Sequence, residues 1–114
     1  MISRNSLSDD SIIINPGTVL DNSNARGMSE TISRAQAEGW KYIVIDMSEL
    51  RFLSSAGVGS ILGGVERSRE RGGDIILCDV PDKILHVLEI LDLCGYLTIK
   101  SSGEIAQDLC VKGG

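Results

Sequence analysis

The chain has 114 residues, a formal net charge of -5 and 42% apolar side chains, which is ordinary for one soluble globular domain. The negative charge excludes a sequence-independent nucleic-acid binder, because such proteins need clustered lysine and arginine to displace counterions. No apolar run reaches the roughly 18 residues of a membrane-spanning helix, and residues 1–10 lack the apolar centre of a secretory signal. We therefore expect one cytoplasmic domain over residues 1–114 that neither binds nucleic acid nor inserts into membranes.

The first half of the chain predicts a strand, a turn and a helix. The opening residues are polar and allow a short edge strand. The β-branched run at 11–15, ended by Pro16 and Gly17, is typical of a strand followed by a turn. Residues 21–23 are all good N-cap types, and Gly39 is placed to end the helix that follows them. The apolar positions of this helix are Ala25, Met28, Ile32 and Ala35.

The middle of the chain predicts a central strand and a second helix. Residues 41–47 are apolar and β-branched without alternation, which indicates a strand covered on both faces. Residues 48–53 form a connection, and a second helix then begins near Ala56. Residues 71–73 close that helix, and 74–80 form another buried strand. The buried stripe of the second helix is predicted at Val58, Ile61, Leu62 and Val65.

The last third predicts a helix, a strand and a final short helix. Pro81 suits the first position of the third helix, which we expect to continue to Gly95. Residues 96–100 form the last strand, and Ser102 caps the final helix. The apolar line of the third helix is Ile84, Leu85, Val87, Leu88 and Leu91. Strands that alternate with helices predict an α/β domain with parallel pairing of the buried strands.

The residue types argue against an enzyme. A hydrolytic serine needs a base, yet the only histidine is His86 within the third helix, and no GxSxG motif occurs. Gly57, Gly59 and Gly63 approximate a GxGxxG motif, but they follow the preceding strand by about ten residues and lack a P-loop lysine. We expect these glycines to let the second helix pack closely on the sheet.

The three cysteines predict neither a metal site nor a redox motif. Cys78, Cys94 and Cys110 are separated far more widely than the ligands of a zinc site or the pair of a CxxC motif. They are interpreted as reduced, mainly structural thiols. The sequence predicts no cofactor.

Two serines at the start of the second helix have two interpretations. Ser54 or Ser55 could simply cap the helix by accepting a backbone N–H. A hydroxyl at a helix N-terminus is also well placed to carry a phosphate, because free N–H groups and the helix dipole favour negative charge there. Asp21 and Asp46 each lie where a loop follows a predicted strand or turn, so each could cap a neighbouring segment or join the serines at one sheet edge.

Four segments in order resemble the STAS domain, and within it the small stand-alone anti-sigma factor antagonists of bacteria. The most specific part is a strand that ends in Asp-x-Ser at 46–48, an aromatic-containing connection, and Ser-x-Gly-x-Gly at 55–59. The segments are 17–21, 42–62, 72–80 and 87–96. The resemblance implies a single domain over 1–114 with a small mixed β-sheet of about four to five strands, flanked by about four helices.

The resemblance also implies a partner and a switch. The partner is an anti-sigma factor that is also a serine kinase with a histidine-kinase-like ATPase fold, and binding it frees a sigma factor. Phosphorylation blocks binding, with Ser55 as the modified residue and Ser54 as the less favoured alternative, and a metal-dependent serine phosphatase restores binding. The resemblance places the partner-binding surface at Asp21, Asp46, Ser54, Ser55, Ala56, Gly57 and Gly59.

One departure from the family pattern leaves alternatives open. The residue before the phosphorylated serine is usually Asp in the kinase-switched members, but here it is Ser54. Either the kinase tolerates a hydroxyl, or Ser54 shares the modification, or this chain is not switched. In the last case it would be an interaction subunit of a signalling complex or of a lipid-transport ATPase. A hydrolase that uses Ser55 is a third reading. The sequence allows a homodimer, but no apolar stripe requires one.

Overall fold

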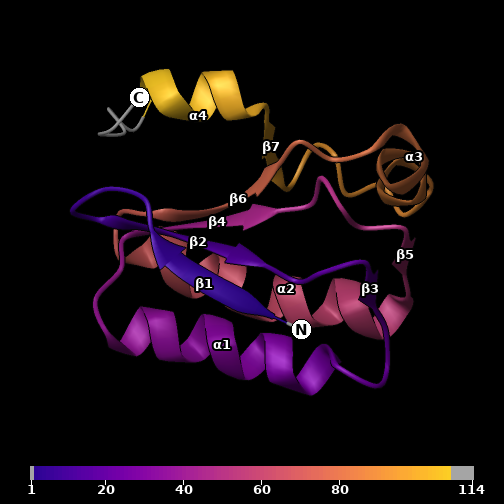
Figure 1. The fold of residues 1–114 in the computed structure, drawn as a ribbon, viewed down its shortest axis with the longest axis horizontal. Helices are drawn as coiled ribbons and strands as arrows, with labels where there is room; N and C mark the ends of the chain where they lie inside the picture. The colour runs from indigo at the N-terminus through magenta and orange to yellow at the C-terminus, as the bar shows by residue number, and fades with distance from the viewer. Residues whose placement is uncertain (1, 109–114) are drawn as a thin grey trace.

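A five-stranded sheet forms the centre of the computed structural model, which describes residues 2–108 (Figure 1). Within this range the strands are β1 (Ser3–Ser6), β2 (Ser11–Asn15), β3 (Val19–Leu20), β4 (Tyr42–Asp46), β5 (Phe52–Leu53), β6 (Asp74–Cys78) and β7 (Thr98–Lys100). The helices are α1 (Ala25–Ala37), α2 (Ser55–Glu70), α3 (Asp82–Ile90) and α4 (Ser102–Asp108).

The main sheet has the order β1-β2-β4-β6-β7, in which only β1 is antiparallel to its neighbour. Ile13, Val44, Ile76 and Thr98 lie in one row across the four parallel strands. The predicted α/β class and the mixed sheet are therefore confirmed, and the expected edge strand in the opening segment is β1.

Two helical layers of unequal size cover the sheet. α1 and α2 lie on one face and the short α4 on the other (Figure 1). Successive residues of a strand point to opposite faces, so Ile43 and Ile45 belong to the large core cluster, while Val44 packs in a smaller cluster with Ile105 of α4. All three β4 residues are fully buried, which confirms the predicted central strand.

Two short strands lie outside the main sheet. β3 and β5 pair in parallel, with Val19 opposite Phe52 and Leu20 opposite Leu53. Figure 1 shows this pair side by side at one end of the molecule, where α2 also begins. Residues 48–53 were predicted as a plain connection, and that prediction is wrong for the last two. Two-residue strands are too short for the alternation that identifies a strand in a sequence.

Three helices end in the same way, but only two of them use glycine. Gly39 after α1 and Gly72 after α2 have positive φ angles of 93° and 82°, as expected for a residue just past a helix. α3 instead uses Asp92, with φ 58°, and the N–H of Leu93 reaches back to the carbonyl of Leu88. The prediction that α3 continues to Gly95 is therefore wrong, and Leu91, expected in the apolar line, is 46% exposed. Aspartate tolerates a positive φ angle, so the end of α3 is not marked by a glycine in the sequence.

The cap of α4 is Ser101 rather than the predicted Ser102. The Ser101 hydroxyl accepts the N–H of Glu104 at 3.2 Å, and the Glu104 carboxylate accepts the N–H of Ser101 at 2.9 Å. This reciprocal pair is a capping box, which leaves Ser102 as the first residue of the helix.

Asp74 ties the end of α2 to the sheet. Its carboxylate accepts hydrogen bonds from the Arg69 guanidinium at 3.0 Å, from the Thr98 hydroxyl and from its neighbour's N–H. Arg69 also donates to the carbonyl of Tyr96 at 2.6 Å and lies 4.8 Å from the centre of the Tyr96 ring. One carboxylate thus connects α2, β6 and β7.

The close approach of α1 and α2 depends on Gly64. A Cβ added there would lie 2.7 Å from Cγ2 of Ile32, whereas one added at Gly63 meets no atom within 4 Å. The Gln36 amide of α1 donates to the carbonyl of Gly64 at 2.8 Å and to the hydroxyl of Ser68 at 3.0 Å. The predicted close-packing role is therefore wrong for Gly63. Gly64 has that role, and it packs against α1.

We expect Gly64→Ala to lower the free energy of unfolding by about 1–3 kcal/mol, because its methyl group overpacks against Ile32. Gly63→Ala should instead raise it by up to about 1 kcal/mol, because alanine favours helix more than glycine does. Urea unfolding followed by circular dichroism measures both. Equal changes in the two variants would contradict the assignment of the close contact to Gly64.

Candidate functional site

The two serines at the start of α2 have different roles. Ser54 is the N-cap residue: its backbone is extended, and its hydroxyl accepts the N–H of Gly57 at 3.2 Å. Ser55 is the first residue of the helix and is exposed. Within residues 2–108, no group hydrogen-bonds to the Ser55 hydroxyl. The capping interpretation therefore applies to Ser54, and the hydroxyl of Ser55 remains free to react.

β3 holds the start of α2 in place. The N–H of Ser54 donates to the carbonyl of Leu20 at 3.0 Å. A Cβ added at Gly57 would lie 2.4 Å from the same carbonyl oxygen, so only glycine allows this approach. Gly57 thus has the predicted close-packing role, although it packs against β3 rather than against the main sheet. Gly59 is exposed and faces open space, so the packing prediction is wrong there.

Asp21 comes to the same place because it follows Leu20 directly. Its carboxylate accepts two hydrogen bonds from Ser23, one from the hydroxyl at 2.6 Å and one from the N–H at 2.8 Å. These two bonds, the hydroxyl first, lower the pKa of the Asp21 carboxyl, so it is ionised at neutral pH. The N-cap residue of α1 is Asn24 rather than one of residues 21–23.

Asn24 fixes the loop that carries Asp21. Its side-chain oxygen accepts the N–H of Asp21 at 2.9 Å, and its side-chain amide donates to the carbonyl of Val19 at 2.7 Å. Asn24 makes no side-chain cap bond to the helix, because both ends of its amide serve the loop. Sequence reasoning missed this residue, since an asparagine before a helix reads only as a cap.

Asp46 is not joined to the serine pair. It ends β4, where its carboxylate accepts the N–H of Ser48 at 3.0 Å. None of the hydrogen bonds among residues 2–108 connects Asp46 to Ser54 or Ser55. Hydrogen bonds thus link Ser54 and Gly57 to each other and to β3, which Asp21 follows directly, whereas Asp46 ends β4 without a hydrogen bond to this group.

Other groups that could do chemistry lack the surroundings for it. Cys78 is buried, and burial first, then the carboxylates of Asp79 and Asp46, raises the pKa of its thiol to about 12. It is therefore protonated at neutral pH and a poor nucleophile. The described part of the chain holds no group of three His, Cys, Asp or Glu side chains that could bind a metal, and none of its helices is long and apolar enough to cross a membrane. Cys110 lies outside the described residues.

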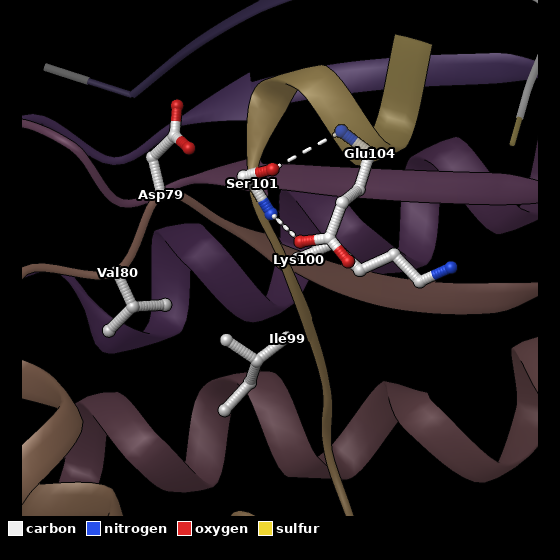
Figure 2. A pocket seen from close by; sticks show the side chains of 6 residues that line it. All are labelled: Asp79, Val80, Ile99, Lys100, Ser101 and Glu104. Atoms are coloured by element: carbon white, nitrogen blue, oxygen red, sulfur yellow. Dashed lines mark hydrogen bonds between the residues drawn. The ribbon is translucent and has the colours of Figure 1, made fainter. Parts of the chain in front are cut away.

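A pocket of about 310 Å³ opens at the carboxyl ends of β6 and β7 (Figure 2). It is lined by Asp79, Val80, Ile99, Lys100, Ser101 and Glu104. Its charged groups already have partners. Asp79 accepts the N–H of Ser102 at 2.8 Å, Glu104 belongs to the capping box, and Lys100 pairs with Asp108. We therefore interpret the pocket as the place where α4 is attached to the sheet and not as a ligand-binding site.

Comparisons with known proteins identify the family and the fold. The STAS domain family model matches residues 5–106. An anti-sigma F factor antagonist from Paenibacillus polymyxa is 35% identical over 72 residues, which span 63% of this chain and 59% of that protein, less than two thirds of its length. The solved structure of unphosphorylated SpoIIAA, an anti-sigma factor antagonist, aligns with a TM-score of 0.82 at 20% identity, over 97% of this chain and 98% of that one. The phosphorylated form of Bacillus SpoIIAA gives 0.75 at 19% identity, over 96% and 99%.

We expect Ser54→Ala to lower the free energy of unfolding by about 1 kcal/mol, because it removes the acceptor for the N–H of Gly57. Ser54→Asp should retain the stability within a few tenths of a kcal/mol, since aspartate caps as well as serine. Ser55→Ala is the matched control and should change little. A larger loss in Ser55→Ala than in Ser54→Ala would reverse the two roles.

We expect Ser23→Ala to raise the pKa of the Asp21 carboxyl toward its ordinary value, because it removes the hydroxyl that lowers this pKa most. The N–H of residue 23 remains, so part of the depression should persist. A carboxyl-carbon NMR titration measures the shift, with Ser29→Ala, at an exposed position of α1, as the control. An Asp21 pKa that is the same in both variants would be inconsistent with this cause.

Proposed function

The chain belongs to the STAS domain family, whose model matches residues 5–106, and we propose that it is a cytoplasmic anti-sigma factor antagonist switched by phosphorylation of Ser55. In the unphosphorylated form it binds an anti-sigma factor that is also a serine kinase with a histidine-kinase-like ATPase fold, and so releases a sigma factor. A metal-dependent serine phosphatase resets the modified form. The chain itself acts by binding, not by catalysis.

The observation that carries this proposal is the division of roles between the two serines. Because Ser54 supplies the cap, the Ser55 hydroxyl can be modified without breaking a hydrogen bond that holds α2. Names of similar proteins give further support: the Paenibacillus relative is an anti-sigma F factor antagonist, and SpoIIAA exists in phosphorylated and unphosphorylated forms.

A phosphate on Ser55 would change the surface and leave the fold intact. It adds about -1.5 to -2 charges at neutral pH, and the N-terminus of α2 favours negative charge at that position. Asp21 in the adjoining loop is already ionised. The modified surface therefore gathers at least two negative groups where the partner has to dock, and the repulsion acts on the partner rather than on the domain.

Ser54 in place of the family's usual aspartate fits the same proposal. Serine and aspartate are equally good N-caps, so the start of α2 keeps its geometry. What changes is the charge beside Ser55, which is one unit less negative than with aspartate. We therefore favour a kinase that tolerates a hydroxyl before the modified serine.

The test is phosphorylation in vitro. We expect a cognate anti-sigma factor kinase with ATP to place phosphate on Ser55, located by mass spectrometry, and Ser55→Ala to lose the incorporation. The phosphorylated protein should bind the kinase at least tenfold more weakly than the unmodified protein, because like charges across an interface cost several kcal/mol. Ser55→Asp should fall between them, since it carries one charge and two oxygens.

Ser102 offers a matched control within the same chain. It is also an exposed first residue of a helix, and it follows a capping serine, Ser101, just as Ser55 follows Ser54. Ser102→Ala should leave incorporation unchanged. Phosphate that persists undiminished in Ser55→Ala would refute the site. Binding that is unaffected by phosphorylation of Ser55 would favour the interaction subunit without a switch.

A further inference from the structure

The small β3–β5 sheet has one buried face and one open face. Leu20 and Leu53, paired across the two strands, are 0% and 7% exposed and belong to the main core. Val19 and Phe52, paired in the same way, are 38% and 53% exposed. Paired residues of a sheet lie on the same face, so Val19 and Phe52 form one apolar patch, here called the Val19–Phe52 pair.

The identity of the exposed residues makes this patch unusual for the chain. Phe52 is the only phenylalanine, in a protein with just 4% aromatic residues. Aromatic rings contribute the most apolar area to cores and interfaces, yet here the one phenyl ring lies half in solvent. Aromatic residues are also enriched in protein–protein interfaces, where a few buried anchors carry most of the binding energy.

The patch lies within reach of any protein that covers Ser55. Phe52 precedes Ser55 by three residues, so their Cα atoms are at most about 11 Å apart. An ordinary interface covers roughly 800 Å² on each partner, which corresponds to a disc of roughly 16 Å radius. The hydrogen bond from Ser54 to Leu20 keeps β3 beside the same spot. A partner of ordinary size centred on Ser55 is therefore large enough to reach both Val19 and Phe52.

We infer that the Val19–Phe52 pair is the apolar anchor for the same kinase partner that modifies Ser55, an inference that rests on the proposed function. The partner carries an apolar pocket that takes the half-exposed phenyl ring of Phe52. The Val19–Phe52 pair supplies binding affinity that does not depend on phosphorylation. Phosphate on Ser55 supplies the charge that weakens the same complex.

A control patch lies at the opposite end of α2. The helix rises about 1.5 Å per residue, so Arg69 is about 21 Å along the axis from Ser55. Tyr96 lies at that end, with the Arg69 guanidinium 4.8 Å from its ring centre. Tyr96 is 44% exposed, close to the value for Phe52, and therefore matches it in type and exposure but not in position.

The experiment compares Phe52→Ser with Tyr96→Ser in binding to the kinase that phosphorylates the wild-type protein at Ser55. We expect Phe52→Ser to raise the Kd for the kinase at least tenfold, measured by calorimetry on unphosphorylated protein, and Tyr96→Ser to change it less than twofold. Urea unfolding confirms that both variants fold. Should Phe52→Ser not fold, Val19→Thr keeps the β-branched shape on the same patch and should still weaken binding severalfold.

The outcomes separate this inference from the proposed function. If the kinase phosphorylates Ser55 but binds Phe52→Ser and Val19→Thr as tightly as the wild type, the anchor is wrong and the switch stands. If Tyr96→Ser weakens binding as much as Phe52→Ser does, the interface lies elsewhere and the anchor is again wrong. If no serine kinase binds or phosphorylates the wild type, the proposed function fails and the anchor fails with it.

Discussion

The carbonyl group of Leu20 is the contact on which the site depends. It accepts the N–H of Ser54, and its oxygen leaves no room for a side chain at Gly57. One backbone atom of β3 therefore fixes both the residue before α2 and the first turn of that helix. It also brings Asp21, the next residue in the chain, to the same surface. Without the β3–β5 pairing, the serines and the aspartate would belong to two unrelated loops.

The neighbourhood of Ser55, more than its position in a helix, makes it distinctive. Ser102 has the same local arrangement at α4, with a capping serine before it and an exposed hydroxyl. Its own N–H, however, is bound by the Asp79 carboxylate, and a phosphate there would lie close to that negative group. The residues that follow Ser55 in the helix, Ala56 and Gly57, are uncharged, and the nearby Asp21 carboxylate is bonded to Ser23 rather than to the start of α2. A helix N-terminus is thus a necessary part of the site but does not define it.

Patterns of several residues were predictable from the sequence, and single contacts were not. Residues 41–47 and 74–80 identify two buried strands because their apolar runs are long, and Gly39 and Gly72 mark two helix ends because positive φ angles favour glycine. The end of α3 at Asp92 has no glycine to mark it, and the two-residue strands β3 and β5 are too short to show a hydrophobic pattern. The family resemblance already favours Ser55 over Ser54 as the phosphorylated residue, but it gives no physical reason; the hydrogen bond from Gly57 shows that Ser54 is the cap.

The helix α2 is held at both of its ends. Leu20 fixes its start, while Asp74 binds Arg69 near its end and at the same time connects to Thr98 of the last strand. Both ends of α2 are therefore held by hydrogen bonds. Between them, the Gln36 amide of α1 bonds to Gly64 and Ser68. We therefore expect a chemical change at the first residue of α2 to act on the surface around it. Under the proposed switch, a protein that distinguishes the two forms would have to contact the start of α2 directly.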